Sequence, residues 1–330
     1  MSTLIITNGE AAVGLVRAAE LCDAAFAWND VLHEGPVPLT PDLASLSTLR
    51  ADYFAGLGDI QAKTVHERFA ARDRAFLEHR RYDRVSLWFE QDLYDQLQVI
   101  QILDEMSGRN GRGHGLFLLQ APSHIGAQKP DDLAGLCELQ EEVSLDQRAI
   151  ARAAWTAYRQ PQPGAWAGFI DADTGALPHL KAAIARSVQD LPAPGTGLSR
   201  TEAQILLAVS KGADAPHIVF RVVQQLEQAA FMGDLSFWRW IDGLAFAPVP
   251  LIKGVREGGI AAARNREEVR AYLMATLSVS DAGRAVLAGK ADFTALNPID
   301  RWLGGTHLTK GNLWRWDEAT GTLIAPRGKG

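Results

Sequence analysis

The chain is predicted to be an α/β protein that begins with a doubly wound, Rossmann-like or flavodoxin-like parallel sheet and continues into a mainly helical, winged-helix-like region. Short β-rich apolar runs alternate with helical patterns over residues 1–125, and strands separated by helices pair in parallel through right-handed crossovers. A length of 330 residues suits two domains. We therefore expect an α/β domain over 1–125, a helical connection and linker over 126–195, and a winged-helix-like α+β domain over 196–330.

The first strand is predicted at Thr3–Thr7 (TLIIT), where β-favouring residues are concentrated. A helix is expected over Glu10–Leu21, because Val13, Val16 and Leu21 recur at helical spacing. The second strand, Ala24–Trp28, ends in the loop 29–36, since the Gly-Pro pair at its close ends regular structure.

Helices at about 41–57 and 62–80 precede the third strand, the strongly apolar Arg84–Phe89 (RVSLWF). From Asp92 onward the pattern predicts an amphipathic helix packed on the sheet. Its apolar face is formed by Leu93, Leu97, Ile100 and Leu103. Gly115–Gln120 (GLFLLQ) completes the sheet as a fourth buried strand.

The second half is predicted to be helical over about 130–190, apart from a Pro-rich break at 160–164. Asp190–Gly197 (DLPAPGTG) is the expected linker. Ser199 and Glu202 form a capping-box pattern that opens a helix over 200–210. Further helices are expected near 216–230, 235–243 and 265–275, followed by a strand at Leu277–Ser280 that runs into 281–289, and by a terminal hairpin of Leu313–Asp317 with Thr322–Pro326.

Composition is that of a globular protein, with 47% hydrophobic and 22% charged residues and a mean hydropathy of −0.07. No apolar run approaches the roughly 18 residues of a membrane span, and no basic leader precedes the first apolar run. We expect a cytoplasmic protein with no membrane partner. Cys22 and Cys137 lie among apolar residues outside any metal-binding pattern, so two reduced, buried thiols are predicted.

The formal net charge of −6 is unevenly distributed. Residues 196–330 hold 16 Lys and Arg against 13 Asp and Glu, so the acidic excess lies before them. Because surfaces that follow nucleic-acid phosphates need a basic excess, nucleic acid is an unfavourable partner for the first part and only a permitted one for the second. A small-molecule ligand and a second copy of the chain remain open as partners.

Polar residues gather where each predicted strand ends, and an open parallel sheet binds ligands outside the carboxyl ends of its strands. Four independent strand ends carry such side chains. They are Asn8 and Glu10; Asn29, Asp30, His33 and Glu34; Glu90, Gln91 and Asp92; and Gln120, Ser123 and His124.

Several of these residues also have a purely structural interpretation. Asp92 has the position of a helix N-cap, Asp30 that of a turn-forming aspartate, and His33 with Glu34 that of a solvated loop. Glu90 is harder to explain in this way, because it directly ends an apolar run and would be half buried unless a polar group meets it.

Carboxylates held close together either share a proton or bind a divalent cation, and either arrangement serves hydrolysis or group transfer. We assign catalysis to Glu90, Asp30 and His33; substrate binding to Asn8, Glu34, Arg50, Asp92 and Gln96; and ligation of a divalent metal, Mg²⁺ or Mn²⁺, to Asp30, Glu90 and Asp92. His124 is a second candidate for proton transfer, and Arg72 with Arg50 either reaches an anionic ligand or forms a solvated or intrahelical ion pair. Dinucleotide, P-loop, esterase and zincin motifs are absent from the sequence.

Three blocks carry a resemblance to a known family: LIITNG at 4–9, WNDVLHEGP at 28–36 and LWFEQDLYDQLQ at 87–98. With these blocks in this order, the chain resembles the bacterial family of uncharacterised proteins known as domain of unknown function 1835 over roughly residues 1–125. The resemblance implies a fold unit and motif positions but no reaction.

Two classes of function follow. The first is a hydrolase or transferase that acts on a phosphorylated or nucleotide-like small molecule at the strand ends. The second is a non-enzymatic ligand sensor whose winged-helix-like part contacts a protein partner or DNA. The segments FWRW at 237–240 and RWLGG at 301–305 would suit nucleic acid, but tryptophans at such spacing are more often core. The segment 218–227 carries only Arg221 as a basic residue, which favours protein contact or dimerisation over DNA reading.

Overall fold

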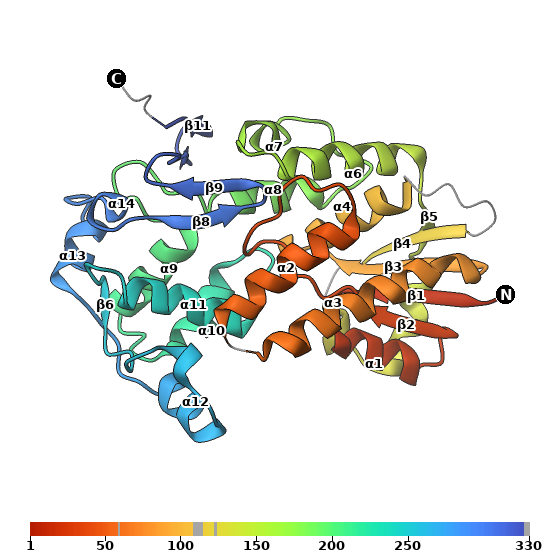
Figure 1. Ribbon diagram of the computed structural model, residues 1–330, viewed down its shortest axis with the longest axis horizontal. Helices are drawn as coiled ribbons and strands as arrows, with labels where there is room; N and C mark the ends of the chain where they lie inside the picture. The colour runs from red at the N-terminus through yellow and green to blue at the C-terminus, as the bar shows by residue number, and fades with distance from the viewer. Residues whose placement is uncertain (59, 108–114, 122–123, 327–330) are drawn as a thin grey trace. The chain divides into compact units, whose positions relative to one another are not determined.

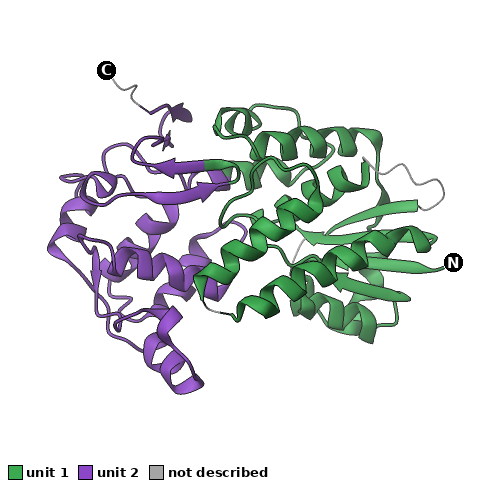
Figure 2. Ribbon diagram, in the orientation of Figure 1, with its two compact units in different colours: residues 1–185, 304–306 green, residues 186–303, 307–330 purple. Residues whose placement is uncertain are grey.

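The computed structural model describes residues 1–58, 60–107, 115–121 and 124–326, and the chain forms two compact units (Figure 2). Unit 1 comprises residues 1–185 and 304–306, and unit 2 comprises 186–303 and 307–330. The helical connection expected at 126–195 is therefore mostly part of unit 1. The boundary falls inside a helix, ahead of the expected linker Asp190–Gly197.

Unit 1 is an α/β unit with a five-stranded, mostly parallel sheet in the order β2-β1-β3-β4-β5 (Figure 1). The strands β1 to β4 are parallel, and β5 pairs antiparallel with β4. The elements are β1 (Thr3–Thr7), α1 (Glu10–Ala18), β2 (Ala24–Ala27), α2 (Leu43–Leu57), α3 (Ala62–Leu77), η1 (Glu78–Arg81), β3 (Arg84–Glu90), α4 (Leu93–Ser107), β4 (Gly115–Ala121), η2 (Ile125–Ala127), η3 (Pro130–Asp132), α5 (Leu133–Cys137), β5 (Glu141–Glu142), α6 (Leu145–Tyr158), α7 (Gly164–Gly168) and α8 (Leu180–Val188), the last of which crosses the unit boundary.

Helices cover both faces of this sheet, because side chains alternate along each strand. Ile5 and Trp88 point to one face, where they pack with Val13 and Val16 of α1 and Leu133 of α5 in a single buried cluster. The other face carries the alternate buried residues, and α4 packs on it over β3. Helix α6 packs in turn on α4, while α2 and α3 pack against each other.

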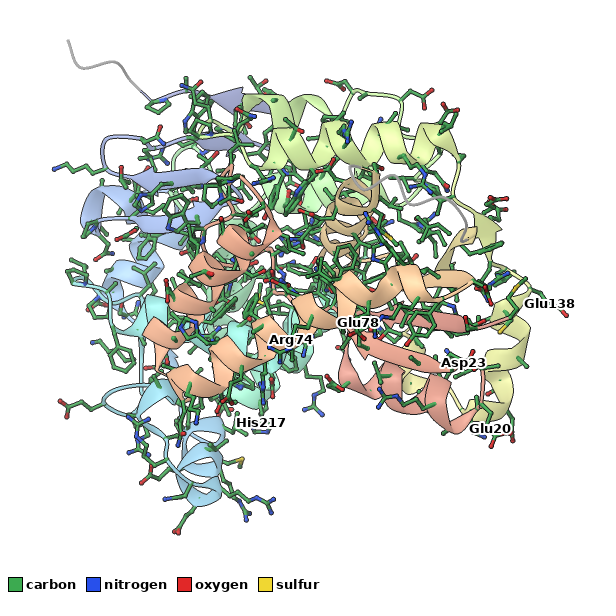
Figure 3. The ribbon with its side chains drawn as sticks, turned by 45° about the vertical axis from the view of Figure 1, so that its right-hand side comes forward. Glu20, Asp23, Arg74, Glu78, Glu138 and His217 are labelled. Carbon is green, nitrogen blue, oxygen red and sulfur yellow. The ribbon has the colours of Figure 1, made fainter. Side chains whose placement is uncertain are left out.

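The amino ends of the strands are closed by turn aspartates. Figure 3 shows Glu20 and Asp23 in the turn from α1 into β2. Asp23 accepts a hydrogen bond from the backbone N–H of Thr3 (2.6 Å), and Asp83 accepts one from that of Ser2 (2.7 Å). The backbone N–H groups of Ser2 and Thr3 at this edge of the sheet are therefore hydrogen-bonded to side chains of the adjacent turns.

Residues 304–306 belong to unit 1 although their neighbours in the sequence belong to unit 2. The carbonyl of Gly304 accepts a hydrogen bond from the N–H of Val37 (2.8 Å), and the N–H of Gly305 donates to the carbonyl of Tyr158 (2.9 Å). Gly304 has φ of 56°, and a Cβ on either glycine would overlap a backbone carbonyl oxygen of α6 or of the residue after it. Glycine is therefore required at both positions.

Unit 2 is mainly helical with short strand pairs. Its elements are α9 (Arg200–Ser210), α10 (Pro216–Leu226), α11 (Asp234–Ala245), β6 (Ile252–Lys253), η4 (Ile260–Ala262), α12 (Arg266–Leu273), β7 (Ser278–Val279), α13 (Asp281–Leu287), α14 (Phe293–Leu296), β8 (Asp300–Leu303), β9 (Thr306–Thr309), β10 (Arg315–Asp317) and β11 (Thr322–Ile324).

The start of α9 and the last strand pair agree with the sequence prediction. The Ser199 hydroxyl accepts a hydrogen bond from the N–H of Glu202, whose carboxylate accepts one from the N–H of Ser199, so the capping box is present. Strands β10 and β11 pair antiparallel as the expected terminal hairpin. The pairs β6–β7 and β8–β9 were only partly predicted, since only β7 stood out in the sequence.

Within the described residues, no helix combines the length and apolar character needed to cross a membrane. Cys22 and Cys137 are free thiols and are half-buried.

Candidate active site

The candidate site lies at the carboxyl ends of β1, β3 and β4. Strand β1 lies between β2 and β3, so the order of the parallel strands reverses there, and this is the place where open α/β sheets bind ligands. Asn8 follows β1, Glu90 ends β3, and His124 follows β4 after a short segment that lies outside the described residues. Ser123, which the sequence also placed at this edge, lies in that segment.

Glu90 is 4% exposed and bonded on both carboxylate oxygens. Its Oε1 accepts hydrogen bonds from the backbone N–H of Ile125 (2.8 Å) and from Nδ2 of Asn8 (3.1 Å). Its Oε2 is hydrogen-bonded to Nδ1 of His124. Glu90 thus meets three polar groups from the two neighbouring strand ends. The Asn8 amide follows β1, and the His124 ring and the Ile125 N–H follow β4.

Asp95, in the first turn of α4, forms a second buried carboxylate beside Glu90. Both of its oxygens lie 3.0 Å from Nδ2 of Asn8, and Oδ2 accepts a hydrogen bond from the backbone N–H of Glu90. The Tyr94 hydroxyl donates to the carbonyl of Asn8 (3.1 Å). Asn8 is therefore held from both sides, through its carbonyl by Tyr94 and through its amide by Asp95 and Glu90.

Asp92 is the third carboxylate and precedes α4. Its Oδ1 accepts a hydrogen bond from the N–H of Asp95 (3.1 Å), so Asp92 acts as the N-cap that the sequence suggested. Burial, reinforced by the charge of Glu90, raises the pKa of Asp92 to about 7. Burial, together with the charges of Asp92 and Glu90, also raises the pKa of Asp95 well above its usual range. Three carboxylates crowded in a low-dielectric environment disfavour simultaneous ionisation.

Glu90, Asp92 and His124 form a group that could hold a metal ion, because one ligand atom from each lies within 4.8 Å of the others. Glu90 and Asp92 are buried, whereas the His124 side chain is 61% exposed. The group therefore combines two fixed carboxylates with one imidazole that faces solvent. Such a set can bind a divalent cation, or it can run acid–base chemistry with the carboxylate orienting the imidazole.

Asp30 lies elsewhere, in a buried ion-pair network. It is fully buried, and its Oδ1 accepts from Nε (3.0 Å) and Nη2 (2.7 Å) of Arg50, while its Oδ2 accepts from Nη1 of Arg72 (3.3 Å). Arg50 also donates to the carbonyls of Val31 (2.7 Å) and Glu34. The metal-capable group does not include Asp30.

This network gives Asp30 and Arg50 contacts that differ from the roles expected from sequence. Arg50 is fully buried, and the carboxylate of Asp30 is ion-paired with the guanidinium groups of Arg50 and Arg72. Arg72 also pairs with Asp73 of its own helix (2.8 Å), which is the intrahelical ion pair that the sequence suggested. Arg50 forms a buried pair with Asp30, which the sequence did not suggest. The pair instead fixes the loop that follows β2.

The remaining candidates surround the site without entering the metal-capable group. The ring of His33 packs edge-on against that of Tyr94, with centroids 6.0 Å apart. Glu34 contributes its carbonyl to Arg50. Gln96 is fully buried, and its Nε2 donates to the carbonyl of Glu90 (2.7 Å), which makes it a positioning residue for the end of β3.

The sequence analysis named neither Asp95 nor Tyr94 as a site residue. The available signal was the spacing of Glu90, Asp92 and Asp95 in the block EQDLYD. Because β3 ends at Glu90 and α4 starts at Leu93, Asp92 at the start of the helix and Asp95 in its first turn both lie close to Glu90.

No model of a known protein family matches this chain, and no curated protein shows significant similarity to it.

Proposed function

We propose that the protein is a hydrolase or transferase that acts on a phosphorylated or nucleotide-like small molecule at the carboxyl ends of β1, β3 and β4. The observation that carries the proposal is the convergence of Glu90, Asp92 and His124, whose ligand atoms lie within 4.8 Å of one another. Two buried carboxylates on a sheet edge are costly without a compensating charge, and a divalent cation supplies that charge.

In this proposal Glu90, Asp92 and His124 would hold the cation, and a bound divalent cation would supply polarisation of a phosphoryl oxygen, which favours attack by water or an acceptor hydroxyl. Asn8 and Asp95 keep Glu90 in place, since the Asn8 amide bridges both carboxylates and Asp95 binds the N–H of Glu90. Gln96 fixes the same strand end through the Glu90 carbonyl. These outer contacts orient the ligands, a role that normally affects metal affinity by ten- to a hundredfold.

The donor set favours Mn²⁺ over Mg²⁺ among the two cations expected from sequence. Carboxylates suit both ions, but imidazole nitrogen is a poor ligand for Mg²⁺ and suits transition metals. Mn²⁺ accepts both ligand types, and it can be followed directly by its paramagnetism.

The test is a titration of Mn²⁺ into metal-free protein, followed by electron paramagnetic resonance and by thermal shift. The parent and the variants Glu90→Gln and Asp92→Asn are compared with Glu10→Gln, which changes an exposed carboxylate at the first residue of α1, close to the same sheet edge. We expect binding by the parent and by Glu10→Gln, and at least about tenfold weaker binding by Glu90→Gln and Asp92→Asn. A panel of nucleotides and p-nitrophenyl phosphate is then assayed with and without Mn²⁺. The proposal is wrong if the parent binds no divalent cation and no nucleotide, and Glu90→Gln is as stable as the parent.

A second candidate function is ligand sensing, in which unit 2 is a winged-helix-like module that contacts a partner. In its favour, α9 packs against α10 and β7, and β7 pairs antiparallel with β6, which places a short hairpin beside a helix pair. Arg221 is the one Lys or Arg of α10, so this candidate favours a protein partner over DNA. An electrophoretic mobility shift of duplex DNA that weakens as salt is raised would support DNA as the partner. If no shift is seen, a protein partner is the remaining alternative.

A further inference from the structure

Helix α4 carries glutamines where a helix packed on a sheet normally carries apolar residues. Gln98 and Gln101 are fully buried and three residues apart, on the same face of the helix as Tyr94. One end of each amide is occupied: Nε2 of Gln98 donates to the carbonyl of Tyr94 (3.4 Å), and Oε1 of Gln101 accepts from the indole N–H of Trp28 (2.8 Å). Oε1 of Gln98 and Nε2 of Gln101 have no hydrogen-bond partner among the described protein atoms.

Trp155 on α6 adds a third such atom. Its side chain is 1% exposed, and its indole nitrogen has no partner among the described residues. Arg152 on the same helix is ion-paired with Asp104 of α4 (3.1 Å). The Arg159 guanidinium lies 5.4 Å from the Trp155 ring centroid. The Arg152–Asp104 pair therefore fixes this part of α6 against the C-terminal half of α4, which also contains Gln101.

Helices α4 and α6 run in opposite directions, which brings Gln98 to the same region. Helix α4 starts at the carboxyl edge of the sheet, after β3, whereas α6 ends there, where the Tyr158 hydroxyl donates to the carbonyl of Leu32 (2.8 Å). Moving along α6 from Arg152 toward Tyr158 thus corresponds to moving along α4 from Asp104 back toward Gln98. The three atoms that lack partners among the described residues thus belong to two helices that pack on each other.

We propose that this α4–α6 interface binds ordered internal water. Buried polar atoms in folded proteins are nearly always hydrogen-bonded, and the chemistry of this set fits water best. Nε2 of Gln101 and Nε1 of Trp155 are donors, while Oε1 of Gln98 is an acceptor. Water accepts two hydrogen bonds and donates one to complete that set, and internal waters typically make about three. A cation would face two N–H donors and an anion would face a carbonyl oxygen, so neither ion is accommodated.

The test uses the indole N–H of Trp155 as a probe in a perdeuterated, amide-protonated sample. The resonance is assigned by its loss in Trp155→Phe, or through backbone correlations if that variant does not fold. We expect cross-peaks between this proton and water that have opposite signs in NOESY and ROESY spectra, the signature of a water that stays bound much longer than water at the protein surface. The indole N–H of Trp28 is the matched control: it is equally buried but bonded to Oε1 of Gln101, so its water cross-peak should be much weaker than that of Trp155.

A second measurement separates a true site from exchange relayed through a nearby hydroxyl. A high-resolution crystal structure should show a water within hydrogen-bond distance of at least two of the three atoms on Gln98, Gln101 and Trp155. The proposal is overturned by a dry interface in the electron density, or by a Trp155 indole proton that shows no water contact in either spectrum. Both outcomes are independent of the proposed activity, because no residue of the metal-capable group takes part.

Discussion

Replacing Asp92 with asparagine tests the electrostatics of the candidate site without removing a helix cap. Asp92 caps α4 through Oδ1, and asparagine is an equally good N-cap. In the metal-free protein, burial and the charge of Glu90 raise the pKa of Asp92 from 3.8 to about 7. The folded state therefore keeps a proton that the unfolded chain releases, and the parent loses stability as the pH rises from about 4 to about 7. At about 1.4 kcal/mol per pH unit, this difference corresponds to roughly 4 kcal/mol.

We expect Asp92→Asn to match the parent near pH 4 and to exceed its unfolding free energy by up to about 4 kcal/mol at pH 8. The assay is urea denaturation in the presence of a chelator at several pH values. Asp42→Asn is the control, because Asp42 caps α2 through the N–H of Ser45 but is exposed, so its variant should follow the parent within about 0.5 kcal/mol. Added Mn²⁺ should stabilise the parent more than Asp92→Asn, because the variant binds the ion more weakly. The reasoning fails if Asp92→Asn is less stable than the parent at pH 8, or if the difference between them does not grow with pH.

Three further substitutions have defined outcomes. Arg50→Met should lower the unfolding free energy by about 3–5 kcal/mol in urea, because Asp30 then stays buried without its main partner; a loss below about 1 kcal/mol would contradict the structural role given to this pair. Ser199→Ala should cost about 1 kcal/mol and lower Tm, since it removes one half of a formed capping box; an unchanged Tm would count against that cap. Tyr94→Phe should cost about 1 kcal/mol and weaken Mn²⁺ binding, because the Asn8 carbonyl loses its hydroxyl donor; an unaltered Kd would show that Tyr94 does not position Asn8.

The four parallel strands could be predicted from sequence because each is an apolar run with a clear boundary. Thr3–Thr7 was predicted and is β1, and Arg84–Phe89 extends by one residue into Glu90 as β3. Strand β5 could not be predicted in this way: it consists of Glu141 and Glu142, both exposed, and it is a strand only because the edge of β4 is available for pairing. The domain limits differed for a related reason, since nothing local in α6 indicates that it packs on α4.

The site illustrates the same division between local and tertiary information. Glu90 stood out because an ionisable residue directly after LWF requires a partner, and the structure supplies three. Asp30 looked equally promising, but its partners Arg50 and Arg72 lie 20 and 42 positions later in the sequence. A buried carboxylate reveals whether it is structural or available for chemistry only when the chain has folded. The resemblance to domain of unknown function 1835, and the function, remain predictions.

The placement of residues 304–306 in unit 1 means that the two units are interleaved along the gene. Neither unit corresponds to one uninterrupted stretch of sequence. A truncated chain ending at residue 185 would leave the N–H of Val37 and the carbonyl of Tyr158 without the partners that Gly304 and Gly305 provide. A replacement of unit 2 by another domain therefore has to keep Gly304 and Gly305, because unit 1 needs their hydrogen bonds to Val37 and Tyr158.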